Sequence, residues 1–216
     1  MALFITFEGV EGCGKSTQVE LLAGRLTELR LPVLTTREPG GCPIADGIRK
    51  ILLDPANTAL APLTELLLYA AARAQHVSEV VLPALEQGRI VICDRFLDAT
   101  MAYQGFGRGL DAELIRQLNH IATGGLQPDL TLLLDMPPRE GLQRATERNR
   151  TAALSHEERF EKETLAFHEK VRRGYLDLAR QNERFRIIDA HGTVEAVAER
   201  IYRVVAEQLA ARNEQP

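Results

Sequence analysis

The sequence predicts an α/β fold, in which a parallel sheet of five strands carries helices on both faces. Two observations support this prediction. Five apolar runs of strand length alternate with segments of helical periodicity, as in repeated strand–helix units with right-handed crossovers. Most of the runs are nearly continuous in Leu, Ile, Val and Phe, which is typical of strands that are buried on both faces.

The elements follow one another along the whole chain. The strand candidates are Leu3–Phe7, Val33–Thr36, Ile90–Cys93, Leu130–Leu134 and Phe185–Ile188. The helix candidates are Ser16–Leu29, Leu63–Glu86, Ala112–Ala122, Arg139–Thr146, Arg159–Gln181 and Val194–Ala211. We expect Pro83 to end or bend the long second helix. No repeat or linker divides the sequence, so residues 1–216 are expected to form a single domain.

Composition restricts the partners of the protein. A formal net charge of -4 provides no global positive field for nucleic acid. No apolar run approaches the roughly 20 residues that cross a bilayer, and the N-terminus lacks the basic stretch of a signal peptide. We therefore expect a cytoplasmic protein without a membrane or nucleic-acid partner. Cys13, Cys42 and Cys93 are an odd number without a CxxC pair, which favours small packed residues over disulfides.

A phosphate-binding loop lies between the first strand and the first helix. Its residues are Gly9, Val10, Glu11, Gly12, Cys13, Gly14, Lys15, Ser16 and Thr17. They match G-x-x-x-x-G-K-[ST] in the correct strand–helix context. The glycines let successive N–H groups face inward around an anion, and the start of the helix adds positive charge. Lys15 is expected to reach the β- and γ-phosphates of a nucleoside triphosphate, and the Ser16 hydroxyl to bind Mg²⁺.

Two further strands end in charged residues. Asp94 and Arg95 follow the strand Ile90–Cys93, and Arg37–Gly41 follows the strand Val33–Thr36. The carboxyl ends of parallel strands face the ligand crevice. Asp94 is thus a candidate to hold Mg²⁺ through water, and Arg95 to grip a phosphate with two hydrogen bonds. The alternatives are a strand-end ion pair for Asp94–Arg95 and a simple turn for Arg37–Gly41.

A basic stretch of about 144–159 has little apolar content. It contains Arg144, Arg148, Arg150 and Arg159. One interpretation is a solvated helix turn, and the other is a mobile lid that closes over phosphates.

Several motifs together resemble the bacterial type of thymidylate kinase, a family of P-loop nucleoside monophosphate kinases. The motifs are Phe7-Glu8-Gly9, Arg37-Glu38-Pro39-Gly40-Gly41, Asp94-Arg95, Ala102-Tyr103-Gln104-Gly105, Pro128-Asp129-Leu130-Thr131, Leu134-Asp135 and Ile188-Asp189-Ala190. The resemblance covers essentially the whole chain. It implies a P-loop NTPase fold with a lid, and transfer of the γ-phosphoryl group of MgATP to dTMP in dTTP biosynthesis. It also implies a homodimer, for which the apolar surfaces around Leu63–Glu86 are candidates.

The resemblance implies roles for individual residues. Arg49 and Arg95 would hold the phosphate of dTMP, and Arg73 would face a thymine carbonyl. Tyr69 would stack on thymine, Thr100 and Gln104 would contact the base, Tyr103 would disfavour a 2′-hydroxyl, and Glu38 would line the sugar side. Ala190 and His191 would lie beside the adenine. The plainer alternatives are core positions for Tyr69 and Tyr103, surface or loop positions for Arg73 and Gln104, and a solvent-facing His191.

The sequence departs from the family pattern at three positions. Ala99 stands where many relatives have serine, and Tyr69 where phenylalanine is common. The phosphate loop carries Glu11 and no arginine, which resembles the branch of the family whose catalytic arginine lies in the lid. That branch makes Arg144, Arg148, Arg150 and Arg159 catalytic candidates beside Lys15, Asp94 and Arg95.

Two other functions fit parts of the sequence. A kinase for another nucleoside monophosphate would share the phosphate loop and differ in its base preference. A regulatory P-loop switch would hydrolyse nucleotide slowly, but GTPase switches usually carry an Asn-Lys-x-Asp guanine motif, which this sequence lacks.

Overall fold

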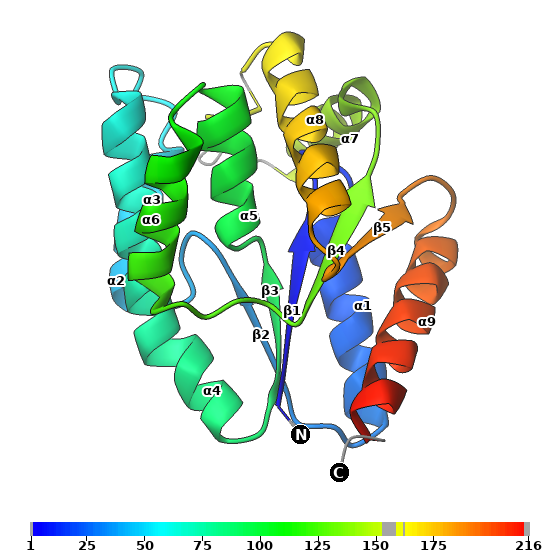
Figure 1. The fold of residues 1–216 in the computed structure, drawn as a ribbon. Helices are drawn as coiled ribbons and strands as arrows, with labels where there is room; N and C mark the ends of the chain where they lie inside the picture. Colours follow the sequence, from blue (N-terminus) through cyan, green and yellow to red (C-terminus); the bar gives the residue numbers. More distant parts are fainter. Residues whose placement is uncertain (1, 153–158, 162, 214–216) are drawn as a thin grey trace.

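The computed structural model describes residues 2–152, 159–161 and 163–213, and of residues 148–152 and 213 it describes the backbone alone. Its centre is a five-stranded parallel sheet in the order β2-β3-β1-β4-β5 (Figure 1). The strands are β1 Leu3–Glu8, β2 Val33–Arg37, β3 Ile90–Asp94, β4 Leu130–Asp135 and β5 Phe185–Asp189. All five predicted strands are confirmed. Each extends one residue further than predicted, and that residue is charged, so each strand ends in a charged side chain at one edge of the sheet.

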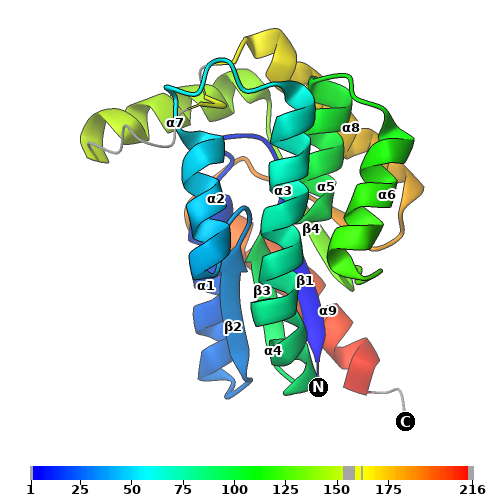
Figure 2. The ribbon, with the colours of Figure 1, turned by 90° about the vertical axis from the view of Figure 1, so that its left-hand side faces the viewer.

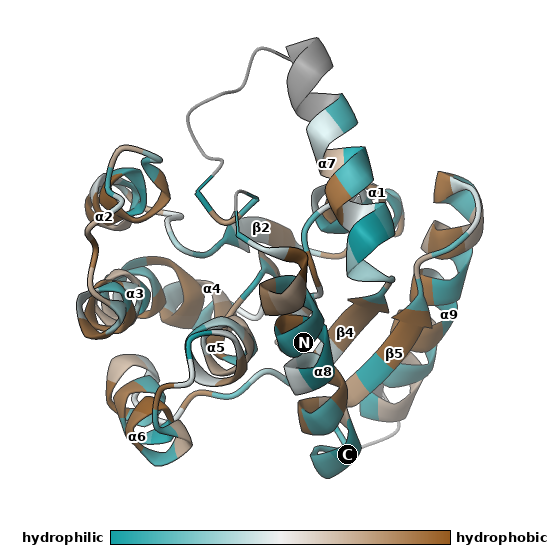
Figure 3. Ribbon diagram, turned by 90° about the horizontal axis from the view of Figure 1, so that it is seen from above, coloured by the Kyte–Doolittle hydropathy of each residue, from teal (hydrophilic) through white to brown (hydrophobic). Residues whose placement is uncertain are grey.

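Helices cover both faces of the sheet, as predicted (Figure 3). They are α1 Lys15–Glu28, α2 Pro43–Leu53, α3 Pro62–His76, α4 Leu82–Glu86, α5 Leu97–Thr100, α6 Ala112–Thr123, α7 Pro138–Ala152, α8 Leu165–Gln181 and α9 Val194–Asn213. There are also two π-helical turns. The first, η1 Val77–Val81, joins α3 to α4, and the second, η2 Met101–Gly107, follows α5. Helices α1 and α9 lie on one side of the sheet, and α3 to α6 and α8 lie on the other.

Two buried clusters pack against the sheet, and the larger one includes residues of both α1 and α8. Ile5 and Phe7 of β1 belong to the buried cluster that contains Leu22 of α1. Phe4 and Val91 belong to a second cluster with residues of η1, α4 and α5. Because both faces of the central strands β1, β3 and β4 are buried, these strands show continuous apolar runs instead of a polar–apolar alternation.

Several predicted helix boundaries were wrong. The predicted helix Leu63–Glu86 exists as the run α3–η1–α4, and Pro83 lies in the first turn of α4. The wider π turn before Pro83 accommodates the ring and the missing N–H within a continuous helix. Helix α7 runs six residues beyond the predicted Thr146. Helix α8 begins at Leu165 and not at Arg159, because the Thr164 side chain caps it by accepting from the N–H of Phe167.

The carboxyl ends of the strands and the N-termini of α1 and α7 meet at the same edge of the sheet. Helix α7 projects from the rest of the molecule at this edge (Figure 2). Helix α2 and the α5–η2 segment were not predicted, and they lie beside the same edge. Among the residues that the structure describes, every helix is too short or too polar to span a lipid bilayer.

Candidate active site

The phosphate loop has the backbone that its glycines predict. Gly9, Gly12 and Gly14 have φ values of 142°, 69° and 94°, which glycine adopts without steric cost. A Cβ atom on Gly12 would lie 1.9 Å from the carbonyl oxygen of Gly141 in α7, so the loop packs directly on the first turn of that helix. A Cβ on Gly14 would meet nothing within 4 Å. Space is therefore open beside the N-terminus of α1, where a phosphate would lie.

Lys15 turns its ammonium group into the loop. Its Nζ atom donates to the carbonyl oxygens of Gly9 and Val10, at 3.2 and 3.0 Å, and the side chain is buried. The loop thus holds one positive charge at its centre. Cys13, which lies 3.6 Å from Nζ through its sulfur, is a buried free thiol, as are Cys42 and Cys93.

Ser16 and Asp94 meet although they are far apart in sequence. The Ser16 hydroxyl donates to Oδ2 of Asp94 at 2.7 Å. The pair combines the first turn of α1 with the end of β3, and both groups offer the oxygen atoms that Mg²⁺ prefers. This donor set fits the predicted Mg²⁺ site.

Arg95 lies at the junction of the phosphate loop and the neighbouring cavity. Its Nη1 donates to the Gly9 carbonyl at 3.0 Å, and its Nη2 donates to Glu11 at 3.0 Å. The Tyr103 hydroxyl donates to the other Glu11 oxygen at 2.9 Å. Burial acts to raise the pKa of Glu11, but Arg95, Lys15 and Tyr103 outweigh it and lower this pKa to about 2. Arg95 itself has a φ of 70°, an uncommon left-handed conformation that is often found at functional sites.

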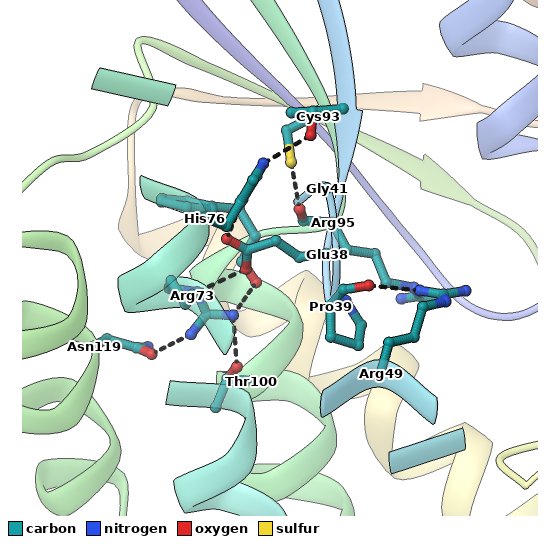
Figure 4. Close-up of polar contacts among 12 residues, drawn as sticks. Glu38, Pro39, Gly41, Arg49, Arg73, His76, Cys93, Arg95, Thr100 and Asn119 are labelled. Atoms are coloured by element: carbon teal, nitrogen blue, oxygen red, sulfur yellow. Dashed lines mark hydrogen bonds and ion pairs between the residues drawn. The ribbon is translucent and has the colours of Figure 1, made fainter. Parts of the chain in front are cut away.

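Arg73 and Glu38 form a buried ion pair on the other side of this region (Figure 4). Arg73 is 1% exposed and donates from Nε to Glu38 at 2.8 Å. Its Nη2 donates to the Thr100 hydroxyl at 3.0 Å and to the Phe96 carbonyl at 3.1 Å, and its Nη1 donates to Asn119 at 2.7 Å. Arg73 is therefore not an ordinary surface arginine.

A single cavity of about 540 Å³ connects these groups. The predicted residues that line it are Glu11, Gly12, Gly14, Lys15, Ser16, Thr17, Glu38, Arg49, Tyr69, Arg73, Asp94, Arg95, Thr100, Tyr103 and Gln104. Arg49 donates to the Pro39 carbonyl at 2.8 Å, which joins α2 to the loop after β2. Ala99 lines the same cavity. Thus the structure brings the predicted phosphate-loop and acceptor residues to one continuous space.

The arginines of the basic stretch 144–159 do not share one environment. Arg144 is exposed on α7, whereas residues 153–158 and the side chains of Arg148 and Arg150 fall outside the described part of the chain. Arg159 donates to Glu65 and to the Leu52 carbonyl, both at 2.5 Å. Its donors thus engage α2 and α3, not the phosphate loop.

Ala190 and His191 lie at the end of β5. Ala190 is buried, and the His191 side chain is exposed, with Nδ1 2.5 Å from Asp189 and Nε2 3.4 Å from Glu140 of α7. The hydrogen bond to Asp189 raises the pKa of His191. Neither residue lines the 540 Å³ cavity.

Some residues of the site were not identified in the sequence. Phe160 lines the cavity and packs edge-on against Tyr103, with ring centroids 5.4 Å apart. An isolated aromatic residue beside the polar stretch 144–159 is the signal that could have identified it. Glu65, which is 1% exposed and accepts from Gln104 at 2.8 Å, had no signal of its own, nor did His76 and Asn119.

Known proteins resemble this chain over nearly its full length. The family model for thymidylate kinase matches residues 7–201. A thymidylate kinase of Syntrophotalea carbinolica is 59% identical over 210 residues, which are 97% of each chain. One of Geobacter sulfurreducens is 55% identical over 213 residues, with 98% of this chain and 100% of the relative covered.

A solved structure agrees with these matches. The crystal structure of thymidylate kinase from Ehrlichia chaffeensis has a TM-score of 0.76 and 34% identity, and covers 94% of this chain and 98% of its own. The sequence match, the shared fold and the phosphate loop agree, and the chain belongs to the thymidylate kinase family.

Proposed function

We propose that this protein transfers the γ-phosphoryl group of MgATP to the 5′-phosphate of dTMP and forms dTDP and ADP. The observation that best supports the proposal is the single cavity of about 540 Å³ that joins Lys15 and Ser16 of the phosphate loop to Arg73 and Tyr69. A donor phosphate at the loop and an acceptor in the buried end would therefore share one space.

The reaction requires alignment more than acid–base chemistry. An oxygen of the dTMP phosphate is already anionic at neutral pH, so it attacks the γ-phosphorus without a general base, and the bond to the β–γ bridging oxygen breaks. Lys15 would neutralise charge on the transferring group, while Arg49 and Arg95 would hold the acceptor phosphate. Exclusion of water by the cavity walls would suppress hydrolysis of ATP.

Ser16 and Asp94 are the residues that we propose for Mg²⁺. Ser16 would bind the ion directly and Asp94 through water, in place of the 2.7 Å hydrogen bond that now joins them. When bound, Mg²⁺ supplies positive charge to the β- and γ-phosphates.

The buried end of the cavity suits a pyrimidine. We propose that Tyr69 stacks on the ring and that Arg73, Thr100 and Gln104 meet its polar edge. Gln104 already donates one N–H to Glu65, which fixes the orientation of its amide. Tyr103 would lie beside the deoxyribose, where a 2′-hydroxyl would be crowded, and Glu38 would line the same side.

The region of about 144–159 is proposed as a lid whose arginines reach the phosphates. Arg144, Arg148 and Arg150 follow one another on α7, which begins against the phosphate loop at Gly141. Arg159 belongs to this lid in our proposal, although its present partner is Glu65. Ala190 and His191 are proposed to face the adenine of ATP.

We also propose a cytoplasmic homodimer in which each chain forms one domain. Leu63, Leu67 and Leu82 on the α3–η1–α4 run are 50%, 48% and 38% exposed. Ile121 on the adjacent α6 is 75% exposed. Apolar side chains concentrated on neighbouring helices favour a buried interface. Light scattering on the wild type and on Leu67→Glu would test it, since the charge should shift the mass toward a monomer.

An assay of ADP release with and without dTMP tests the proposed function. We expect turnover to depend on dTMP, with little release from MgATP alone. Equal ADP release without any monophosphate would instead support the regulatory switch.

A further inference from the structure

Arg73 is held by a polar network that extends behind the active-site cavity (Figure 4). The described lining of the cavity includes Glu38, Arg73 and Thr100, but it does not include His76 or Asn119. His76 is 0% exposed and Asn119 is 5% exposed. These two residues therefore contact the ligand-binding groups without facing the ligand space.

His76 supports Glu38 and the loop that carries it. Its Nδ1 lies 3.0 Å from Oε1 of Glu38, and its Nε2 lies 2.7 Å from the Thr36 hydroxyl. Because a carboxylate oxygen only accepts, Nδ1 carries the hydrogen and donates it. A Cβ atom on Gly41 would lie 2.6 Å from both the His76 ring and the Thr36 hydroxyl. The loop from Thr36 to Gly41 is therefore folded directly on the imidazole.

Asn119 supports the opposite end of the guanidinium. Its Oδ1 accepts from Nη1 of Arg73 at 2.7 Å, and its Nδ2 donates to the Leu97 carbonyl at 3.2 Å. The second bond fixes the amide, so that its oxygen must face Arg73. Glu38 on one side and Asn119 on the other thus determine the plane of the guanidinium.

The guanidinium, which lines the cavity, keeps one donor for a ligand. Arg73 has five N–H groups, and its bonds to Glu38, Asn119, Thr100 and Phe96 use four of them within the described part of the chain. The remaining N–H belongs to Nη1. A donor matches the carbonyl at C4 of thymine or uracil, and it opposes the amino group of cytosine.

We infer that His76 and Asn119 are positioning residues that fix this N–H toward the base and thereby select pyrimidines with a carbonyl at C4. The inference rests on the proposed function, which places the base beside Arg73. Loss of either support leaves buried polar groups unpaired, and the guanidinium turns to satisfy them. The C4 carbonyl of dTMP then loses its hydrogen-bond donor. The C4 amino group of dCMP is only relieved of the repulsion from that donor, so the preference for dTMP falls.

The test compares kcat/KM for dTMP and dCMP at saturating MgATP. The variants are His76→Leu, Asn119→Leu, His76→Asn and, as a control, Val81→Ala. The amide nitrogen of asparagine is as many bonds from Cα as Nδ1 of histidine, so His76→Asn keeps a donor for Glu38. Val81 is buried in η1 within the cluster of Phe4 and Val91. Its side chain carries no hydrogen-bonding group, so its truncation lowers stability without removing any polar group of the network.

We expect each leucine variant to lower the dTMP-to-dCMP ratio about tenfold, which corresponds to about 1.4 kcal/mol. The loss should appear in KM for dTMP, with KM for ATP unchanged. His76→Asn should keep most of the ratio. Val81→Ala should lower the melting temperature and leave the dTMP-to-dCMP ratio unchanged. This is also the result expected of the leucine variants if His76 and Asn119 only stabilised the fold.

Different results separate the two claims. A wild type that uses dCMP as well as dTMP overturns the base assignment of the proposed function. A wild type that prefers dTMP, with leucine variants that are folded by circular dichroism and keep the ratio within about twofold, overturns the positioning role. If one leucine variant does not fold, the other decides together with His76→Asn.

Discussion

The guanidinium of Arg95 lies 3.0 Å from the carboxylate of Glu11, so the arginine that we propose for the acceptor phosphate is bound to the phosphate loop itself. Tyr103 completes this contact by donating to the second Glu11 oxygen. An incoming phosphate would compete with Glu11 for Arg95. Glu11 therefore holds Arg95 in place before substrate binds. The same carboxylate would repel the phosphates of the substrates.

The first prediction concerns Glu11→Gln and pH. Since the pKa of Glu11 in the fold is about 2, below its ordinary value of 4.5, its stabilising effect is present above pH 4.5 and is lost as the pH falls toward 2. The variant should be less stable at pH 7 by roughly 1–3 kcal/mol and should lose less stability on acidification. Urea unfolding at several pH values between 2.5 and 7 measures both effects. Parallel curves for the two proteins would contradict the assigned contact.

The second prediction concerns Lys15→Ala. Lys15 carries the positive charge at the centre of the phosphate loop, and its loss should reduce transition-state stabilisation by roughly 3–5 kcal/mol, a factor of about a hundred to several thousand in rate. The fold should persist, because the ammonium group bonds only to its own loop among the described residues. Near wild-type turnover would be incompatible with the assigned phosphate site.

The third prediction concerns Mg²⁺. Chelation with EDTA should abolish ADP release, and added Mg²⁺ should restore it. Ser16→Ala should raise the Mg²⁺ concentration needed for half-maximal rate by about tenfold or more, because a direct ligand is lost. Thr27→Ala is a control on the same helix, since its hydroxyl donates to the Ala23 carbonyl. An unchanged Mg²⁺ requirement in Ser16→Ala would exclude Ser16 as a ligand.

The fourth prediction concerns the lid arginines. One of Arg144, Arg148 and Arg150 is expected to stabilise the charge that develops in the transition state. Alanine at that position should lower kcat more than it raises the KM for either substrate. Arg159→Ala should also reduce stability, because it leaves the buried Glu65 without its 2.5 Å partner. Steady-state kinetics and thermal melts of the four variants measure this. If all four keep wild-type kcat, none of these arginines stabilises the transferred phosphoryl group.

The sequence predicts much of this fold for definite physical reasons. Strands buried on both faces leave long apolar runs, and the phosphate loop requires glycines at fixed spacing. Helix α2 was missed because Gly40, Gly41 and Pro43 precede it and Gly47 lies in its middle, and such residues are typical of a loop. Its amphipathic pattern, in which Ile44, Ile48 and Ile51 recur at helical spacing, was the available signal. The start of α8 is set by a single cap at Thr164, which periodicity does not reveal.

The supporting residues of the site could not be predicted in the same way. Asn119 meets Arg73 across 46 positions of sequence, and His76 meets Glu38 across 38. The packing of α3 on α6 brings the first pair together, and the packing of α3 on the loop after β2 brings the second together. In the sequence, Asn119 and His76 each resemble an ordinary helix position. By contrast, Lys15 and Ser16 belong to a local motif whose geometry is encoded within nine residues.

We expect the protein to phosphorylate dTMP in preference to other nucleoside monophosphates. Steady-state kinetics with dTMP, dUMP, UMP and dGMP at saturating MgATP test it most directly. The thymine methyl group is worth about 1 kcal/mol or slightly more when fully buried, so dUMP should be poorer by about five- to tenfold, and UMP should be poorer still because of its 2′-hydroxyl. Arg73→Ala should weaken dTMP use and leave the KM for ATP nearly unchanged. We expect dGMP to react near background, and a purine monophosphate that matched dTMP in the wild type would show that the base-binding residues are assigned wrongly.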